Sequence, residues 1–366
     1  MDVIIDRRGE VLHKIKVLVV ATSVYIHKQI VGLIAEDSAI EVIGAARNSP
    51  EAVCMVHELR PDVVVLNIEI PEMKSIVALT SIMTQRPMPI LTLSPLDGVS
   101  ATITALLNGA VDFITTPTGL NAHDLSGVKD ELILKIKQAA QIPLRNLILN
   151  NITLSKVDAG GKEKTQVTLN RDFDQIVAIG TSTGGPKALE IVLAALPASF
   201  PYPLLIVQHM PPTYTQALAD RLNRFAGVKV VEAEDNQIVL GGTVYLAPGD
   251  YHMTVIQSGK EFRIQLDQKP LVNGQRPSVD VLFDSISELK TLKRHLILMT
   301  GNGRDGAKGM LTAKQAGVET TIVESKETSI AYEMPGAAVE LSCVDYQVPL
   351  YLITSKILEV TGEMRR

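Results

Sequence analysis

The amino-acid sequence predicts an α/β protein of two domains, each built on a doubly wound parallel sheet. Short apolar runs alternate with helix-length segments over residues 15–140, and the same alternation resumes at residue 175. Between them, residues 158–164 read Asp-Ala-Gly-Gly-Lys-Glu-Lys, which is typical of a solvated linker. A length of 366 residues also suits about two domains. We therefore expect a first domain at 15–140, a linker at 141–174 and a second domain at 175–366.

The first domain is expected to contain a flavodoxin-like sheet. Apolar strands are predicted at residues 15–21, 41–46, 62–68, 89–94 and 112–116, and each is followed by a segment long enough for a helix. In such a repeat the helices cover both faces of a parallel sheet, so the strands read as nearly continuous apolar runs.

The second domain begins with a strand, a tight turn and a helix. The apolar run 176–179 leads into the segment 180–184, which reads Gly-Thr-Ser-Thr-Gly, and Pro186 then opens an apolar helix at 187–196. Proline suits a first helical turn because it lacks only a donor that would have no partner there. Ser182 is thus expected beside a helix N-terminus, in the pattern of a nucleophile elbow. An ordinary turn rich in glycine and serine is the alternative interpretation.

Two further polar side chains follow predicted strands of the same domain. The strand at 204–209 ends in His209, and the strand at 296–300 runs into a loop that carries Asp305. The carboxyl ends of parallel strands meet at one edge of a sheet, so these side chains are expected near Ser182. A serine nucleophile needs a base, and the imidazole needs a carboxylate to orient it. The sequence therefore predicts a catalytic triad of Ser182, His209 and Asp305.

A second choice of triad is available in the sequence. Ser182, Asp250 and His295 follow the chain order of the α/β-hydrolases. His295, however, precedes its predicted strand, which puts it at the opposite edge of a parallel sheet. We rank this set below the first.

A dinucleotide site is the other alternative. The segment 301–306 reads Gly-Asn-Gly-Arg-Asp-Gly, and Glu324 follows about 20 residues later, as the dinucleotide fingerprint requires. Asp305 would place a carboxylate where the pyrophosphate must lie. Serine hydrolysis is therefore the preferred interpretation.

Composition excludes several classes of function. The 35 Lys and Arg residues against 40 Asp and Glu give a net charge of −5 without a basic run, which argues against binding of nucleic acid. No apolar stretch approaches the ~18 residues of a membrane span, so membrane insertion is not expected. Cys54 and Cys343 lie in apolar surroundings and are expected to be free thiols, as in a reducing cytoplasm. No group of residues has metal-ligand spacing, and we expect neither a metal nor a cofactor.

These motifs together resemble the chemotaxis protein-glutamate methylesterases of the CheB type, in which a receiver domain precedes a Rossmann-like serine-hydrolase domain. The resemblance covers nearly the whole chain. The segments 179–186, 208–212 and 300–307 are similar to those that carry the family's serine, histidine and aspartate, which implies Ser182, His209 and Asp305. The family usually has methionine where this chain has Asn302. The resemblance implies that the backbone N–H groups of Thr183 and Asn302 form the oxyanion hole.

The resemblance also implies an activity. A CheB-type enzyme removes methyl esters from glutamyl residues of chemoreceptors and deamidates glutamine in chemotaxis signalling. The expected partners are methylated cytoplasmic segments of chemoreceptors and a chemotaxis kinase or adaptor. A non-catalytic adaptor that binds receptors or signalling partners through the retained fold is the alternative from another class of function.

The first domain resembles a receiver in its pattern of elements but not in its chemistry. Ala21 and Thr22 stand where receivers carry an acidic pair, Asn67 stands at the phosphorylated aspartate, and Thr116 replaces a lysine. In receivers the carboxylates hold Mg²⁺, the central aspartate is the nucleophile and the lysine balances the acyl phosphate. We therefore expect a degenerate receiver that cannot be phosphorylated.

Overall fold

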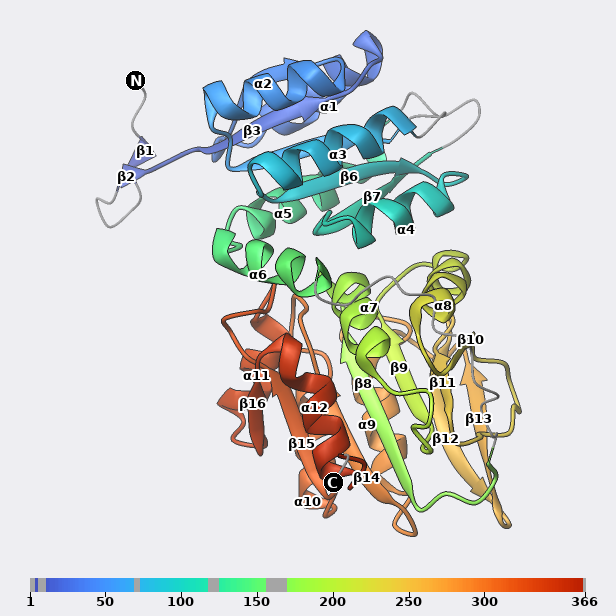
Figure 1. Ribbon diagram of the computed structural model, residues 1–366. Coiled ribbons are helices and arrows are strands. Elements are labelled where there is room, and N and C mark those ends of the chain that lie inside the picture. Colours follow the sequence, from blue (N-terminus) through green and yellow to red (C-terminus); the bar gives the residue numbers. More distant parts are fainter. Residues whose placement is uncertain (1–3, 6–10, 69–72, 118–124, 156–169, 365–366) are drawn as a thin grey trace. The chain divides into compact units, whose positions relative to one another are not determined.

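The computed structural model describes residues 4–5, 11–68, 73–117, 125–155 and 170–364 (Figure 1). The chain divides into two compact units, Met1–Ile148 and Leu149–Arg366. Each unit contains one large sheet in which every pair of neighbouring strands is parallel. The predicted fold class of two doubly wound parallel-sheet domains is thus confirmed.

The first unit is built on a five-stranded sheet in the order β4-β3-β5-β6-β7. Its strands are β3 (Ile15–Val20), β4 (Ile40–Ala46), β5 (Val63–Asn67), β6 (Ile90–Pro95) and β7 (Asp112–Thr116). Its helices are α1 (Val24–Ala35), α2 (Ser49–Leu59), α3 (Met73–Gln85), α4 (Val99–Leu107) and α5 (Lys129–Ala139). The apolar side chains of β5 are buried, as a central strand between two layers of helices requires.

Short elements complete this unit. A two-stranded antiparallel sheet pairs β1 (Ile4–Ile5) with β2 (Val11–Leu12), and a 3₁₀ turn, η2, spans Ser126–Val128. Along the chain, β3 is followed by β4, which lies on one side of β3, and then by β5, which lies on its other side. The sheet therefore has its topological switch point between β3 and β5, where ligands of open α/β sheets bind.

The second unit is built on a seven-stranded parallel sheet in the order β10-β11-β9-β8-β14-β15-β16. The strands are β8 (Gln175–Thr181), β9 (Leu204–Gln208), β10 (Lys229–Glu232), β11 (Thr243–Leu246), β14 (Lys293–Leu298), β15 (Thr320–Glu324) and β16 (Tyr346–Val348). Here the switch point falls between β8 and β14, because β9 to β11 lie on one side and β15 and β16 on the other.

Helices cover both faces of this sheet (Figure 1). They are α7 (Gly185–Ala195), α8 (Tyr214–Phe225), α9 (Val279–Ser287), α10 (Ala307–Gln315), α11 (Glu333–Glu340) and α12 (Leu350–Val360). The helix α7 contacts α8 and α12, whereas α9 contacts α10. The hydroxyl of Thr354 in α12 donates to the carbonyl of Val192 in α7 at 2.9 Å. The helices α7, α8 and α12 thus form one layer against the sheet, and α9 and α10 belong to the other.

An antiparallel hairpin, absent from the sequence-based prediction, packs beside α9. It pairs β12 (His252–Ser258) with β13 (Glu261–Asp267). Met253, Val255 and Ile264 of the hairpin belong to the same buried cluster as Phe283 of α9. The hairpin therefore extends the core beyond the edge of the parallel sheet.

The predicted linker differs from the structure in one respect. The stretch expected as linker, 141–174, contains helix α6 (Leu144–Ser155), and the division between the units falls inside that helix. The side chain of Leu147 is 3% exposed, so this part of the helix has an apolar contact that stabilises it. The polar segment 158–164 lies outside the described residues.

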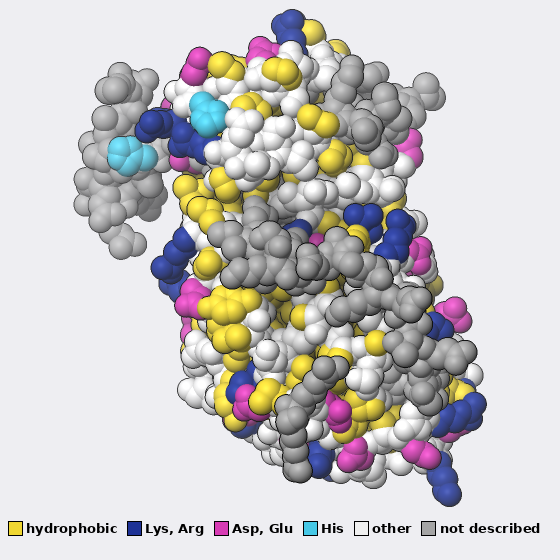
Figure 2. All heavy atoms as spheres, in the orientation of Figure 1, with side chains coloured by type: hydrophobic (Ala, Val, Ile, Leu, Met, Phe, Trp, Pro, Cys, Tyr) yellow, Lys and Arg dark blue, Asp and Glu magenta, His cyan; other side chains and the backbone are white. Residues whose placement is uncertain are grey.

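The surface carries charges of both signs. On the face shown in Figure 2, lysine and arginine side chains are interspersed with acidic and apolar ones. Among the described residues, none of the helices has the length and apolar character needed to span a bilayer. Neither described cysteine is in a disulfide; Cys54 is exposed and Cys343 is buried.

The core around α9 gives the first testable prediction. Phe283 is fully buried, so Phe283→Ala should lower the free energy of unfolding by about 3–5 kcal/mol in urea denaturation of the full chain. Phe225 at the end of α8 is 43% exposed, and Phe225→Ala is the matched control with an expected loss below about 1 kcal/mol. Equal losses in the two variants would contradict this account of the core.

Candidate active site

Ser182 lies in the turn that joins β8 to α7. Its backbone N–H donates to the carbonyl of Thr300 at 2.9 Å, and its carbonyl accepts from the N–H of Gly185 at 2.8 Å. Gly184, the residue that caps α7, has φ +78°, a left-handed conformation that glycine adopts without strain. This turn carries Ser182 past the end of the strand to the N-terminus of α7, where its side chain is partly exposed.

The loop that follows β14 packs directly against this turn. A Cβ at Gly301 would lie 2.8 Å from the Cβ of Ser182, so only glycine permits this approach. The hydroxyl of Thr181 donates to the carbonyl of Thr300, and the hydroxyl of Thr300 donates to the carbonyl of Thr183, each at 2.9 Å. The two loops on either side of the switch point are thus fixed to one another around Ser182.

His209 follows β9 and lies next to the same turn. Its backbone N–H donates to the carbonyl of Thr181 at 3.1 Å. The side-chain amide of Gln208 donates to the carbonyls of both Ser182 and His209, at 2.9 and 3.1 Å. The backbones of Ser182 and His209 are therefore held side by side, as the positions of their strands in the sheet predict.

The imidazole of His209 is oriented by Asp305. Nε2 of His209 lies 2.8 Å from Oδ2 of Asp305, and both side chains are nearly buried. Nδ1 of His209 is also buried, and no described residue provides it with a hydrogen-bond partner. One ring nitrogen therefore faces the carboxylate, and the other is available for a further proton-transfer partner.

Asp305 is itself held by the N-terminus of α9. The N–H of Val279 donates to Oδ2 at 2.6 Å, and the hydroxyl of Ser278 and the side-chain amide of Asn273 donate to Oδ1, each at 2.8 Å. Burial raises the pKa of Asp305, but the hydrogen bonds from His209, Asn273 and Val279 outweigh it and hold the pKa below its ordinary range. The carboxylate is thus kept ionised beside the imidazole.

Asn273 and Ser278 support Asp305 although they are not among the site residues that the sequence predicts. Ser278 precedes an apolar helical run and caps α9, which is a readable N-cap signal. Asn273 lies in a loop with φ +53°, and its amide donates to Asp280 as well as to Asp305. No sequence pattern distinguishes Asn273, because its role depends on two carboxylates that the fold brings together.

The expected oxyanion residues lie opposite each other across the two loops. The side-chain amide of Asn302 donates to the hydroxyl of Thr183 at 3.1 Å. Asn302 therefore links the loop after β14 to the turn after β8 at a position where the resemblance suggested methionine. The sequence left open whether this amide would add a donor; in the structure it is directed at Thr183.

The alternative triad is not assembled. His295 lies near the beginning of β14, where Nε2 is 3.0 Å from the side-chain oxygen of Gln175 at the beginning of β8. Burial lowers the pKa of His295 to about 4, so the ring is neutral at physiological pH. His295 is thus at the edge of the sheet opposite to Ser182, as its place in the sequence predicts. Asp250 pairs instead with Arg276.

The position of Glu324 contradicts the interpretation of this loop as a dinucleotide site. Its carboxylate is completely buried, accepts from the N–H of Thr300 at 2.9 Å and accepts from the hydroxyl of Thr328 at 2.9 Å. A residue buried in this way cannot receive a ribose hydroxyl. Instead, Glu324 supports Thr300, whose carbonyl accepts from the N–H of Ser182.

The altered receiver positions lie together at the carboxyl ends of the strands in the first unit. Ala21 and Thr22 follow β3, Asn67 ends β5 and Thr116 ends β7. Ala21 is 2% exposed and its N–H donates to the carbonyl of Ala46. Among the described residues of either unit, no group of three or more His, Cys, Asp or Glu side chains could hold a metal ion.

A serine at a strand–helix turn, with a histidine and an aspartate at neighbouring strand ends, is the arrangement of α/β serine hydrolases. Comparisons with known proteins agree with this class. A family model described as CheB methylesterase matches residues 177–357, and a response regulator receiver domain model matches residues 17–123.

Relatives resemble this chain over nearly its whole length. A protein-glutamate methylesterase/protein-glutamine glutaminase of Geobacillus kaustophilus is 40% identical over 95% of this chain and 99% of its own. One of Pyrococcus horikoshii is 40% identical over 96% of this chain and 95% of its own. The crystal structure of the Thermotoga maritima CheB methylesterase catalytic domain is 40% identical, with a TM-score of 0.50, and covers 52% of this chain and 100% of its own. The chain belongs to the CheB methylesterase family.

Glu324 gives a prediction for pH dependence. Burial raises its pKa to about 7, whereas the unfolded value is near 4.3. The folded state therefore binds more protons than the unfolded state between these values, so stability should fall as pH rises through this range, by up to about 4 kcal/mol. Glu324→Gln cannot ionise, and its free energy of unfolding should lack this part of the slope.

The measurement is urea unfolding of both proteins at several pH values between 4 and 8. Glu340, whose carboxylate is 66% exposed and pairs with Arg304, provides the control Glu340→Gln. This control should retain the wild-type slope. An unchanged slope in Glu324→Gln would show that Glu324 does not ionise in this range.

Proposed function

We propose that this protein hydrolyses the methyl esters of glutamyl residues in chemoreceptors, with Ser182 as nucleophile, His209 as base and Asp305 as the residue that orients His209. Family membership supports the reaction. The assignment of residues is supported by the contact between Nε2 of His209 and Asp305. This contact lies beside the turn that contains Ser182.

The contact of Nε2 with Asp305 supports a different proposed role for each nitrogen of His209. Asp305 accepts from Nε2 and so favours the tautomer that carries its proton there. Nδ1 is then the unprotonated nitrogen that accepts the proton of the Ser182 hydroxyl as its oxygen attacks the ester carbonyl. The protonated ring next gives this proton to the departing methoxide, which leaves as methanol. Water then hydrolyses the acyl-enzyme and releases glutamate.

The oxyanion of each tetrahedral intermediate is proposed to accept from the backbone N–H groups of Thr183 and Asn302. A donor of this kind typically contributes about 10²–10³ in kcat. The bond between the Asn302 amide and the Thr183 hydroxyl supports this role, because it fixes the separation of the two segments that carry those N–H groups.

Deamidation of glutamine is proposed at the same site. Attack on a glutamine side chain forms the same acyl-enzyme, and ammonia leaves in place of methanol. The names of the relatives include a glutaminase activity beside the methylesterase.

The proposed substrates are methylated cytoplasmic segments of chemoreceptors, and the proposed setting is the cytoplasm. A chemotaxis kinase or adaptor is proposed as a further partner, because the family joins the hydrolase to a receiver domain. The competing function is a non-catalytic adaptor. It is favoured by the loss of the receiver's acidic residues, and a folded chain that releases no methanol would establish it.

Substitution of the proposed triad is the direct test. Ser182→Ala, His209→Ala and Asp305→Ala should each lower kcat for methanol release from methylated chemoreceptors by about 10⁴-fold or more. Because the three residues act as a unit, Ser182→Ala with His209→Ala should be little worse than Ser182→Ala alone.

The matched control is Ser258→Ala, on an exposed position of the β12–β13 hairpin, which should keep the wild-type rate. Thermal unfolding of each variant verifies that it is folded. Undiminished turnover by folded Ser182→Ala would refute the assignment of the nucleophile.

A separate prediction concerns the first unit. Incubation with acetyl phosphate and Mg²⁺ should leave no base-labile phosphate on the chain, because Asn67 cannot form an acyl phosphate and Ala21 supplies no metal ligand. Asn67→Asp alone should also remain unlabelled, since Ala21 and Thr22 still lack carboxylates. Mass spectrometry that found phosphate on wild-type protein, lost after mild base, would contradict this interpretation of the receiver.

A further inference from the structure

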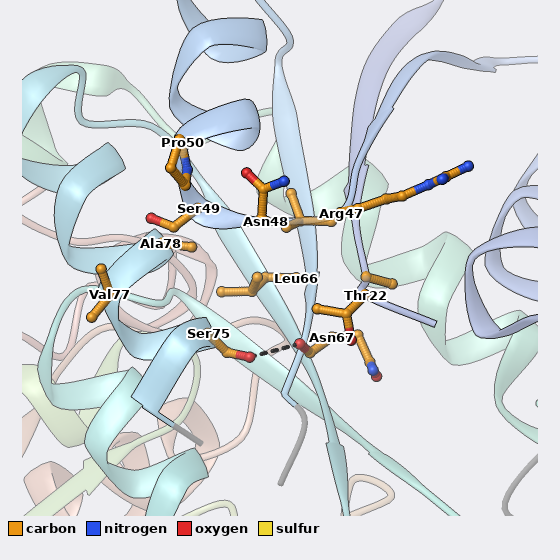
Figure 3. A pocket seen from close by; sticks show the side chains of 12 residues that line it. Thr22, Arg47, Asn48, Ser49, Pro50, Leu66, Asn67, Ser75, Val77 and Ala78 are labelled. Atoms are coloured by element: carbon orange, nitrogen blue, oxygen red, sulfur yellow. Dashed lines mark hydrogen bonds between the residues drawn. The ribbon is translucent and has the colours of Figure 1, made fainter. Parts of the chain in front are cut away.

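A cavity of about 400 Å³ lies next to the altered receiver positions (Figure 3). It is bordered by the carboxyl ends of β3 and β5, by the segment from Arg47 to Pro50 at the start of α2, and by one side of α3. All of these elements belong to the first unit. The lining residues of the cavity therefore belong to a different unit from Ser182.

The place of this cavity in the fold is one where ligands bind. The sheet of the first unit has its switch point between β3 and β5, and the connections there leave a crevice outside the carboxyl ends of the strands. The volume lies within the range of about 300–1,000 Å³ that small-molecule pockets occupy. Size and position thus agree with a ligand site.

The walls of the cavity are mainly apolar. Val20, Leu66 and Ala78 line it and are between 1% and 5% exposed. Apolar walls of this kind offer few hydrogen bonds to water in the crevice. An apolar group that displaces such water gains free energy on binding.

Polar groups of the lining are uncharged, with one exception. Thr22, Asn67 and Ser75 supply hydroxyl and amide groups, and the Ser75 hydroxyl donates to the backbone carbonyl of Asn67 at 3.2 Å. Arg47 is the charged member of the described lining, and Figure 3 shows its side chain extending away from the other residues. The described lining thus offers hydrogen bonds without a carboxylate for a cation.

An anion is equally disfavoured at the start of α2. The side chain of Asn48 caps this helix and accepts from the N–H of Glu51 at 2.9 Å. The carboxylate of Glu51 accepts from the N–H of Arg47 at 2.8 Å. Two backbone N–H donors at the start of α2 are therefore occupied, and the carboxylate of Glu51 would repel a second negative charge there.

We propose that this cavity is a binding site for a compact, uncharged and largely apolar small molecule that forms a hydrogen bond with the polar group around Asn67. The ligand occupies the crevice in which the uncharged residues Ala21, Thr22 and Asn67 stand at the altered receiver positions. The inference rests on the first unit alone, so it stands or falls independently of the proposed hydrolysis.

Indole is a suitable probe, since it is neutral, largely apolar and carries one N–H donor. The chain contains no tryptophan, so indole fluorescence can be followed without a tryptophan background from the protein. Titration of the full chain, checked by equilibrium dialysis, should show saturable binding of one indole per chain. Absence of saturable binding up to the solubility limit of indole would overturn the proposal.

Two valines locate the bound probe. Val77 of α3 lines the cavity and Val24 of α1 does not, while both are 48% exposed. Val77→Asp should raise the dissociation constant of indole roughly tenfold or more, because the bound ring would desolvate the new carboxylate. Val24→Asp should bind as the wild type does. Equal affinities in these two variants would place the indole elsewhere and refute the site.

A variant that fills the cavity provides a second measurement. Ala78 is 2% exposed and lines the cavity, so Ala78→Leu should occupy part of the space and weaken indole binding roughly tenfold or more. Circular dichroism verifies that each variant is folded. If Ala78→Leu does not fold, the comparison of the valine variants still decides the outcome. Unchanged affinity in folded Ala78→Leu would count against the proposal.

Discussion

The close contact between the loop after β8 and the loop after β14 is the constraint on which the candidate active site depends. A parallel sheet brings the two strand ends to one edge, but it does not fix the loops themselves. Gly301 permits backbone contact with Ser182, and the carbonyl of Thr300 accepts from both the N–H of Ser182 and the hydroxyl of Thr181. This contact fixes the position of Ser182 in the site.

Buried carboxylates support this contact from two directions, and their surroundings set their charge. Asp305 accepts hydrogen bonds from His209 and from the start of α9, which keep its pKa low in spite of burial. Glu324 accepts fewer hydrogen bonds, and burial raises its pKa to about 7. Two buried acids near the same strand ends thus have pKa values shifted in opposite directions, because more hydrogen bonds reach Asp305 than Glu324.

The two units use the same topological rule for different chemistry. In each, functional positions gather at the switch point of a parallel sheet, between β8 and β14 in one and between β3 and β5 in the other. In the second unit, these positions include Ser182, His209 and Asp305, with His209 and Asp305 in contact. The first unit has a buried apolar sheet, and the residues at its altered receiver positions, which include Ala21, Asn67 and Thr116, are uncharged. One topology can therefore present different sets of side chains at its switch point.

The sequence by itself determined the fold class, the order of most strands and helices along the chain, and the residues at the strand ends. Periodic apolar runs and the turn at 180–184 are local signals, so they could be read without coordinates. Helix α6 was missed because the mixed polarity of its residues resembles a linker, and Leu147 is buried only through tertiary packing. The sequence could also propose Ser182, His209 and Asp305, since strand ends of a parallel sheet converge.

Only the tertiary structure decided how these residues are held. The nitrogen of His209 that faces Asp305 is set by side-chain directions across loops that are far apart in sequence. The hydrogen bond from Asn302 to Thr183 depends on the same kind of contact. Asn273 and Glu324 could not be placed from the sequence, because their partners come together only when separate strands and helices pack. Residue types and their order are local properties, whereas hydrogen-bond partners across a sheet edge are set by the whole fold.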